Sequence, residues 1–393
     1  MLTAQLSGCN LFIDMRYLET DTLPGLTETE RRILSLLRVH GPLSKPELAS
    51  GGGLDCGWAT VTKHVKRLEE KGLLREAGTR SRSGRYGRNA RLYSLSDSTG
   101  CVIALDVERR LTTAAIRTLG GRCLWQAGFP TPDVSLLAHA VRFLADCAEK
   151  ARHASVEDVV ISGLGITWPF PPSSDSTSPA RYPALAEAVE NAVGLPCCIE
   201  HNVSAYAEWL RYERAWPDFV LFSIRTGVGG AVVVADRLHR GRGFAGQLGH
   251  LPTGGGHPCT CGRTGCLEAE TGLPALTRFY RESGGSAEPD LRALFETDDA
   301  AMERTREHLV RHLAAALETL RVVLDPPLYV IAGRFGVAGN VLPGLIEARV
   351  QGLSGRVRYL ELGDEFITAA AFLFQRQYFA ASGSTKKGTD YGI

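Results

Sequence analysis

The sequence lacks a long apolar run. Nowhere in its 393 residues do about 18 uncharged apolar residues follow one another, which argues against a membrane-spanning helix. The first twenty residues also lack the basic start and apolar core of a secretory signal, because Asp14, Arg16 and Glu19 interrupt the candidate segment. We therefore expect a cytoplasmic protein without a membrane partner. Thiols stay reduced in the cytoplasm, where clustered cysteines hold a metal more often than they form disulfides.

The sequence also has almost no net charge, but its charges are unevenly placed. Residues 27–95 hold fourteen Lys or Arg and seven Asp or Glu, a net charge of +7, so the rest of the chain carries −6 of the total of +1. A basic segment of this kind indicates contact with a polyanion. The apolar content of 44% is typical of a soluble globular protein, and 393 residues are enough for two or three domains.

Residues 27–74 contain three short helical patterns. The first begins at Thr27, an N-cap with Glu30 three positions later, and ends at Gly41. The second, "SKPELAS", has Ser44 as its cap and Pro46 in the first turn, where the missing N–H costs nothing. Three helices in this order are typical of a helix-turn-helix domain.

The third pattern, "WATVTKHVKRLEEKGLL", predicts the helix that enters a DNA major groove. Val61, Val65 and Leu68 form its apolar stripe. Four residues lie away from that stripe and are predicted to contact DNA: Thr60, Thr62, Lys63 and Lys66. For the basic residues Lys66, Arg67 and Lys71 taken alone, a solvated helix face is the simpler interpretation.

The next segment, "REAGTRSRSGRYGRNARLYSL", is predicted to form a β-hairpin wing. It ends in an alternating strand before Leu95, and its six arginines are accompanied by one acid, Glu76. Arginines on such a loop suit phosphate contacts or a narrow minor groove. Four of them are assigned to DNA binding: Arg80, Arg82, Arg85 and Arg88. Residues 27–95 resemble winged helix-turn-helix repressors, so double-stranded operator DNA is the expected partner.

The remainder of the chain predicts two α/β lobes around a cleft. Residues 100–126 indicate three antiparallel strands, and residues 132–153 indicate a helix. Strands and helices then alternate, through a helix at 306–325 and a strand at 328–333, to a last helix at 364–379. A strand-rich opening followed by alternating elements, twice over, is typical of such a two-lobed architecture.

Three of the ten cysteines lie within eight residues, in the stretch "GHLPTGGGHPCTCGRTGCLE" that begins at Gly249. One imidazole and three thiolates there suit a tetrahedral structural zinc ion with no open position: His250, Cys259, Cys261 and Cys266. His257 is an alternative imidazole, although the adjacent Pro258 disfavours it. The seven other cysteines are scattered, and we interpret them as small packed side chains.

Residues from about 100 to 380 resemble the ROK family of repressors, open reading frames and sugar kinases. The stretch "GQLGHLPTGGGHPCTCGRTGCLEAE" is similar to the family pattern E-x-G-H followed by C-x-C-G-x-x-G-C-x-E. The resemblance implies a ribonuclease H-like, actin-like ATPase fold and a structural zinc, and it favours His250 as the imidazole ligand. It also implies sugar contacts from Gln247, His250 and Glu268. The family has Glu where this chain has Gln247, so a charge-assisted bond is lost.

Two motifs that a ROK kinase needs are altered. The phosphate turn D-x-G-G-T reads "DVERR" here, with Glu108 and Arg109 at the glycine positions. The Asp of E-N-D-A-N, which takes the proton from the attacking hydroxyl, is Asn202 in "EHNVS". An amide cannot act as a general base, but Asn202 can still bind a sugar hydroxyl. The later "TGVGG" is interpreted as a tight turn between strands rather than a phosphate loop.

These features predict a sugar-responsive transcriptional regulator whose kinase-like domain senses a sugar or sugar derivative without converting it, and repression is the expected effect. A homodimer or higher oligomer is expected, because two heads read two half-sites. The alternatives are an ATP-dependent sugar kinase with a regulatory head, and a regulator that answers to a protein partner.

The expected domains of the chain are a flexible arm at 1–26, the winged helix-turn-helix at 27–96, the sugar-binding domain at 97–380 with a zinc loop at 247–268, and a disordered tail at 381–393.

Overall fold

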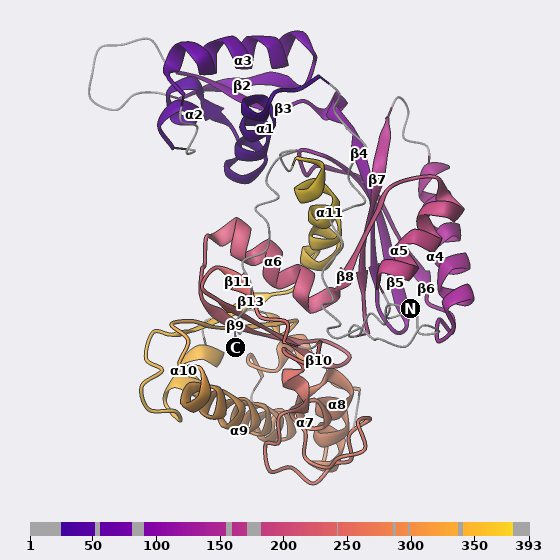
Figure 1. The fold of residues 1–393 in the computed structure, drawn as a ribbon. Coiled ribbons are helices and arrows are strands. Elements are labelled where there is room, and N and C mark those ends of the chain that lie inside the picture. Colours follow the sequence, from indigo (N-terminus) through magenta and orange to yellow (C-terminus); the bar gives the residue numbers. More distant parts are fainter. Residues whose placement is uncertain are drawn as a thin grey trace, which may run out of the picture. The chain divides into compact units, whose positions relative to one another are not determined.

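The computed structural model divides the chain into two compact units, which are described separately (Figure 1). Unit 1 comprises residues 1–202 and 367–393, and unit 2 comprises residues 203–366. The described residues are 25–51, 56–80, 90–154, 159–170, 182–241, 243–285, 288–297, 299–336 and 341–379. Among them, no helix combines the length and the apolar character that crossing a membrane would require. The expected arm at 1–26 and tail at 381–393 fall almost entirely outside the described residues.

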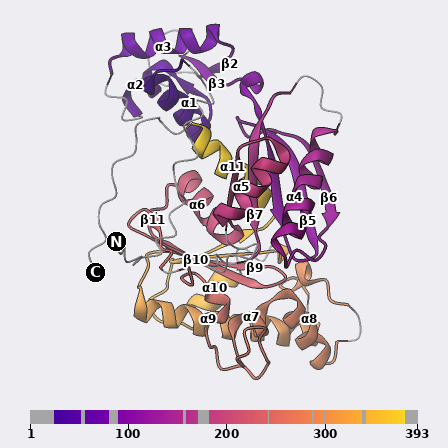
Figure 2. The same cartoon turned by 45° about the vertical axis from the view of Figure 1, so that its right-hand side comes forward.

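The first part of unit 1 is a head of three helices and a small sheet (Figures 1 and 2). Its elements are α1 (Glu28–His40), β1 (Leu43–Ser44), α2 (Lys45–Gly51), α3 (Trp58–Glu70), β2 (Leu74–Arg80) and β3 (Ala90–Leu95). The strands pair antiparallel in the order β1-β3-β2. Three helices followed by a β-hairpin are the arrangement that the sequence predicts for a winged helix-turn-helix.

Capping boxes fix the first residues of two head helices. The Thr27 hydroxyl accepts the Glu30 N–H at 3.3 Å, and the Glu30 carboxylate accepts the Thr27 N–H at 2.8 Å. Ser44 and Glu47 make the same reciprocal pair at the start of α2, at 2.8 and 3.4 Å. Both N-caps were expected from the sequence, and both are confirmed.

The third helix is shorter than its sequence pattern. Val61, Val65 and Leu68 are fully buried, as expected, but α3 ends at Glu70 rather than continuing to Leu74. Gly72 has φ +71°, a conformation that ends a helix at little cost for glycine. The chain then turns into β2.

The rest of unit 1 is a five-stranded sheet in the order β6-β5-β4-β7-β8. Its strands are β4 (Cys101–Val107), β5 (Leu111–Thr118), β6 (Cys123–Pro130), β7 (Ile161–Trp168) and β8 (Cys197–His201), and its helices are α4 (Leu137–Arg152), α5 (Tyr182–Val193) and α11 (Glu365–Tyr378), with the short 3₁₀ helix η2 (Asp97–Thr99) before β4. Strands β4, β5 and β6 pair antiparallel, as expected, whereas β4, β7 and β8 run parallel.

This sheet is covered on both faces. Alternate residues of β4 point to opposite sides, so Ile103 and Leu105 share a core with α4 and α5, while Ala104 shares a core with α11. Helix α11 lies so close to β7 that a Cβ added to Gly165 would be 1.8 Å from the carbonyl oxygen of Ala370. Glycine is therefore required where α11 crosses the strand.

Unit 2 repeats the same strand pattern. Its sheet has the order β11-β10-β9-β12-β13. Its strands are β9 (Phe219–Ile224), β10 (Val228–Val234), β11 (Arg237–Leu238), β12 (Tyr329–Gly333) and β13 (Val357–Glu361). Three strands are again antiparallel, and β9, β12 and β13 are parallel. The expectation of two successive α/β lobes is confirmed by this repetition.

One long helix supplies much of the unit 2 core. The helices are α6 (Asn202–Arg214), α7 (Leu267–Thr271), α8 (Leu273–Glu282), α9 (Ala300–Val323) and α10 (Leu342–Glu347), with the 3₁₀ helices η3 (Leu248–His250) and η4 (Leu291–Ala293). Leu309, Leu313 and Leu317 of α9 are buried in one core with Phe222 and Ile331 of the sheet. Helix α9 begins six residues before the expected start at 306, because the Asp299 carboxylate accepts the Met302 N–H at 2.8 Å.

Candidate functional site

The segment that holds the clustered cysteines, residues 247–268, folds back on itself. We call it the metal loop. The Thr253 N–H donates to the Gly265 carbonyl at 2.9 Å, and the Cys259 N–H donates to the Arg263 carbonyl at 2.7 Å. Gly265 has φ +75°, and a Cβ there would lie 2.4 Å from the carbonyl oxygen of Gly255. A glycine at this point therefore lets the two arms of the loop close.

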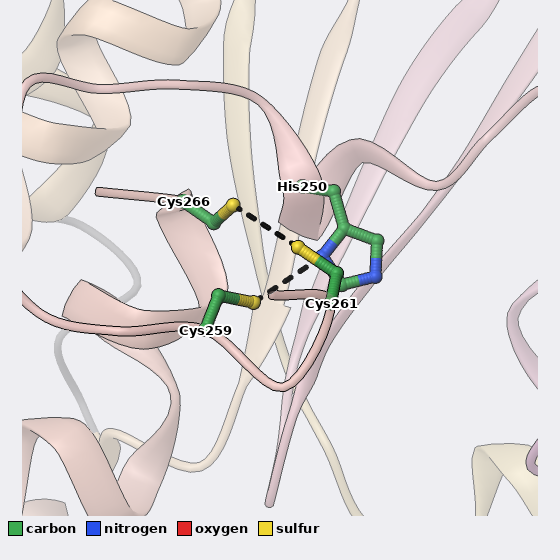
Figure 3. Close-up of side chains that lie close together, drawn as sticks. All are labelled: His250, Cys259, Cys261 and Cys266. Atoms are coloured by element: carbon green, nitrogen blue, oxygen red, sulfur yellow. Dashed lines mark hydrogen bonds between the residues drawn. The ribbon is translucent and has the colours of Figure 1, made fainter. Parts of the chain in front are cut away.

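This folding brings the four expected metal donors together (Figure 3). The His250 Nδ1 lies 3.5 Å from the Cys259 Sγ, and the Cys261 Sγ lies 3.6 Å from the Cys266 Sγ. In a tetrahedral zinc site with Zn–N of about 2.05 Å and Zn–S of about 2.3 Å, a nitrogen and a sulfur are about 3.6 Å apart and two sulfurs about 3.8 Å apart. Both distances fit these values, so the donor set suits a closed zinc site.

The three cysteines of the metal loop differ in their surroundings. Cys259 and Cys266 are buried, whereas Cys261 is exposed. The Arg263 backbone N–H and then its guanidinium donate to the Cys261 sulfur and lower the pKa of that thiol to about 7. Burial raises the pKa of Cys266 to about 12. A metal held by these sulfurs would require thiolates, so its binding would displace at least the Cys266 proton.

His257, the alternative imidazole ligand, has other partners. Its backbone N–H donates to the Glu270 carboxylate at 3.0 Å, and its Nδ1 lies 2.7 Å from the second Glu270 oxygen. The Thr253 hydroxyl lies 2.9 Å from the His312 Nδ1 of α9. These contacts fasten the metal loop to α7 and α9, and the geometry therefore favours His250 as the metal ligand.

A second group of metal-ligand types lies beside this attachment, formed by Glu270, His308 and His312, all buried. The Arg311 guanidinium lies 3.2 Å from the His308 Nδ1 and 3.4 Å from the His312 Nε2. Burial and the neighbouring His312 lower the pKa of His308 to about 4, so this imidazole is neutral at pH 7. Neutral rings that accept from a guanidinium form a hydrogen-bond network, and we assign no metal to them.

The expected sugar-binding residues belong to both units. Gln247, His250 and Glu268 are half-buried residues of unit 2, and each lies within three residues of a metal donor or is one. The Glu268 carboxylate accepts the Val228 N–H at 2.9 Å. Asn202, the first residue of α6, is the last residue of the first segment of unit 1.

The turn "TGVGG" packs tightly against these elements. The Arg225 N–H donates to the Gly227 carbonyl at 2.8 Å, and this closes a short turn between β9 and β10. A Cβ on Gly227 would lie 2.5 Å from a Glu268 oxygen, and one on Gly230 would lie 2.4 Å from the Leu248 Cγ. These glycines make room for protein side chains, which supports the interpretation as a turn between strands.

The segment "DVERR", in which the sequence predicts an altered phosphate turn, runs from the end of β4 into the turn before β5. The Glu108 N–H donates to the Leu111 carbonyl at 3.0 Å and closes the hairpin. The Arg109 guanidinium lies 5.7 Å from the centre of the Phe170 ring. Asp106, just before the turn, is buried and accepts the Thr167 hydroxyl at 2.7 Å. Glu108 and Arg109 thus both lie at this hairpin turn, where the sequence predicts an altered phosphate motif.

The expected DNA-binding residues differ in exposure. Thr60, Lys63 and Lys66 are exposed on α3, but Thr62 is half-buried, and its hydroxyl oxygen is buried without a partner within the described part of the chain. Arg80 forms an ion pair with Glu47 of α2. The other expected wing residues lie outside the described residues: Arg82, Arg85 and Arg88.

A buried carboxylate that the sequence did not single out for this role holds α3 against α1. Glu30 is fully buried, and its Oε1 lies 3.2 Å from the His64 Nδ1 and 3.4 Å from an Arg67 nitrogen. Burial raises the pKa of Glu30, but the Thr27 N–H, His64 and Arg67 outweigh it and hold this pKa below its usual value. Arg67 itself is exposed, as expected for a solvated helix face, and one of its nitrogens pairs with this carboxylate. The only sequence signal for the buried role of Glu30 is the presence of an acid at the third position of an apolar helix.

The scattered cysteines are not all packed. Cys101, Cys147 and Cys197 are buried, whereas Cys56 and Cys198 are half-buried. Cys123 is exposed, so the interpretation as a packed side chain is wrong there, because β6 is the edge strand of its sheet. Cys9 lies outside the described residues.

Two family models match the chain. Residues 102–360 match the model of the ROK family, and residues 26–77 match the model of the MarR family. The first covers the two repeated α/β sheets, and the second covers the three head helices and the start of the wing.

Curated relatives include both regulators and kinases. The chain is 24% identical over 337 residues to a putative xylose repressor of Caldicellulosiruptor sp., covering 79% of this chain and 84% of the relative. It is 24% identical over 346 residues to the DNA-binding transcriptional dual regulator NagC of Escherichia coli K12, covering 80% and 82%. A glucokinase of Halalkalibacterium halodurans is 26% identical over 271 residues, which is 61% of this chain and 82% of the relative.

A solved structure resembles the chain over most of its length. It is a ROK family transcriptional regulator described as a homolog of the Escherichia coli Mlc protein, with a TM-score of 0.67, 20% identity, and coverage of 90% of this chain and 96% of that one. At this identity the likeness concerns the fold. The expected combination of a winged helix-turn-helix with an actin-like α/β domain is confirmed.

Proposed function

This chain belongs to the ROK family, and from that premise we propose that it is a sugar-responsive, DNA-binding transcriptional regulator. The observation that carries the proposal is that one polypeptide contains both domains. A winged helix head lies where the chain matches the MarR family, and a sugar-kinase-like domain lies where it matches the ROK family. The alignments with the putative xylose repressor and with NagC cover 79% and 80% of this chain, which is more than the ROK match alone. Since its partner is DNA, we place its action in the cytoplasm, and repression is the expected effect.

The head is proposed to bind an operator through α3 and the wing. Lys63 and Lys66 are exposed on α3, and Arg80 lies at the end of β2. Cationic side chains of this kind neutralise DNA phosphates, so affinity should fall as salt rises. Arg82, Arg85 and Arg88 stay predictions for the wing. We further propose a homodimer, because two heads fit the two half-sites of a palindromic operator.

The sugar is proposed to bind at Gln247, His250 and Glu268, with Asn202 as a further hydroxyl partner. The three unit 2 residues all lie in the metal loop, where zinc would be held by His250, Cys259, Cys261 and Cys266. When bound, zinc supplies a rigid, closed structural centre with no position for substrate. A fixed loop keeps the sugar-binding groups in place and lowers the entropy that binding costs.

The ROK domain is proposed to sense a sugar without phosphorylating it. Glu108 and Arg109 occupy the turn where a nucleotide phosphate would need a bare backbone, and Glu108 adds a repelling charge. Asn202 stands where a kinase has its general base. The glucokinase relative favours an active kinase as the second candidate. Transfer of labelled phosphate from ATP to a hexose, pentose or amino sugar, abolished by Asn202→Ala, would establish that candidate instead.

The main proposal is tested by selecting DNA with the full chain. Purified, zinc-loaded protein is incubated with a pool of random duplexes at ~150 mM salt, where non-specific phosphate binding is weak. We expect a palindromic consensus to be enriched, and one sugar among xylose, N-acetylglucosamine and glucose to change the affinity for it. A pool that stays random after repeated selection would contradict the function.

A further inference from the structure

Trp58, the first residue of α3, carries a large exposed indole. Its side chain is 60% exposed, and the next two residues, Ala59 and Thr60, are also exposed. Within the described part of the chain, no hydrogen bond, ring contact or cation joins the indole to another residue. The packing of the described head therefore gives no reason for a tryptophan here.

The position of Trp58 is the one that matters for reading DNA. In a helix-turn-helix domain the N-terminal residues of the recognition helix contact base edges. Gly57 precedes it with an ordinary φ of −68°, and a Cβ there would meet no described atom within 4 Å. Neither backbone conformation nor packing requires that glycine. The space beside Gly57, the residue before Trp58, is therefore free of described atoms.

Three neighbouring groups on α3, the Thr62 hydroxyl, Lys63 and Lys66, do not supply an apolar contact to a base, which Trp58 can supply. The Thr62 hydroxyl oxygen is buried, so it is not presented to a base. Lys63 and Lys66 are exposed cations that suit phosphates as point charges. Large aromatic side chains, in contrast, are the usual anchors of interfaces, because they bury much apolar area with few rotatable bonds.

We propose that Trp58 reads a thymine of the operator by packing its indole against the C5-methyl group in the major groove. This inference rests on the proposed function as a DNA-binding regulator. Among the four bases, thymine alone presents a methyl group in that groove. An apolar ring there would desolvate polar base edges at any other base pair, and so it favours thymine.

The experiment uses the full zinc-loaded chain and the consensus duplex that the wild-type chain selects from a random pool. Affinities are measured for wild type, Trp58→Ala, Trp58→Phe and Lys66→Ala over a series of salt concentrations. We expect Trp58→Ala to lose about 10-fold or more on the consensus and little on an unselected duplex. Trp58→Phe should keep part of the affinity. Lys66→Ala, the matched control on the same helix, should weaken both duplexes and reduce the salt slope by about 1.

Uracil identifies the contact itself, because it lacks only the methyl group. Each consensus thymine is replaced in turn by uracil. At one position per half-site we expect a several-fold loss of affinity for wild type and none for Trp58→Ala.

Two results would overturn the inference while leaving the regulator proposal intact. They are equal affinity of Trp58→Ala and wild type for the consensus, and uracil losses that persist in Trp58→Ala. A wild-type chain that selects no consensus would instead refute the proposed function and this inference with it. Unchanged melting temperatures of the exposed-site variants show that folding is not the cause.

Discussion

Two cysteines of the metal loop show how strongly a residue's surroundings set its chemistry. Cys261 is exposed, and hydrogen bonds from Arg263 lower its pKa to about 7, so it offers a thiolate near neutral pH. Cys266 is buried, which raises its pKa to about 12. A zinc ion that binds both must therefore stabilise a buried thiolate. Loss of the Cys266 sulfur should consequently affect the fold as well as the metal.

Replacement of Cys266 tests the zinc proposal at this residue. We expect wild type to hold one zinc per chain and Cys266→Ser to hold almost none, measured by elemental analysis of dialysed protein. Losing the bound ion should cost at least about 2 kcal/mol, which lowers the melting temperature by about 4–8 °C for a unit of this size. The control is Cys123→Ser, an exposed cysteine outside the loop that should keep both values. Full zinc content in Cys266→Ser would contradict the assigned ligand set.

Residue-level prediction from sequence succeeds where partners are close in the chain. The grouping of the four metal donors was predictable because Cys259, Cys261 and Cys266 are close together and the imidazole is nine residues away. Thr62 points away from the helical stripe by its spacing, yet the fold buries its hydroxyl oxygen. The ion pair between Arg80 and Glu47 joins two elements 33 residues apart, and no local pattern reports such a contact.

Among the elements, α1 and α3 are joined by one buried acid in addition to their shared apolar core. Glu30 caps α1 through Thr27 and also contacts His64 and Arg67 of α3. Its pKa is held below the usual value in the folded protein. When folding lowers the pKa of an acid, the charged acid stabilises the folded state at every pH above its pKa in the unfolded chain. This stabilisation is lost as the pH falls through its pKa in the folded protein. The helix pair should therefore weaken in acid.

Glu30→Gln tests this contribution. We expect the substitution to destabilise the head by about 1–2 kcal/mol at pH 7, because an amide lacks the charge that His64 and Arg67 face. Wild type should lose stability as the pH falls below about 4.5, and the variant should lose less over that range. Hydrogen exchange of the α1 and α3 amides at several pH values measures both. Glu70→Gln, on the exposed face of α3, is the control, and equal exchange in the two variants would contradict the role.

The elements themselves were predicted unevenly, for local reasons. The helix expected from 132 begins only at Leu137, because the Asp133 carboxylate accepts the Ser135 N–H at 2.9 Å and forms a turn instead. Strand β13 was not predicted, since "VRYLE" is short and lies at the sheet edge with mixed burial. Its parallel pairing with β12 stabilises an extended strand that its own sequence does not predict.

At the scale of the whole molecule, a buried amide connects the head to the rest of unit 1. The Arg38 Nε of α1 donates to the Gln375 Oε1 of α11 at 2.8 Å, and the Gln375 Nε2 donates to the Thr118 carbonyl of β5 at 3.1 Å. The Arg38 guanidinium also lies 5.7 Å from the centre of the Phe372 ring. Leaving these groups unpaired would cost about 1–3 kcal/mol. This cost equals a typical coupling free energy between two binding sites, so the contacts of Arg38 and Gln375 are strong enough to transmit a change between the head and the sheet of unit 1.

If the sugar controls operator binding, the operator must control sugar binding by the same factor. This reciprocity follows because both routes lead to the same ternary complex. We expect the effective sugar to change the operator Kd by about 5- to 150-fold, and the consensus duplex to change the sugar Kd equally. Titration calorimetry of sugar into free and operator-bound protein measures the second factor, and fluorescence anisotropy of labelled duplex measures the first.

The variant Glu268→Gln keeps an acceptor for the Val228 N–H but removes the charge proposed to hold a sugar hydroxyl. It should weaken sugar binding and leave the operator Kd without sugar unchanged. A sugar that binds free and operator-bound protein with one affinity would show that it does not regulate this chain.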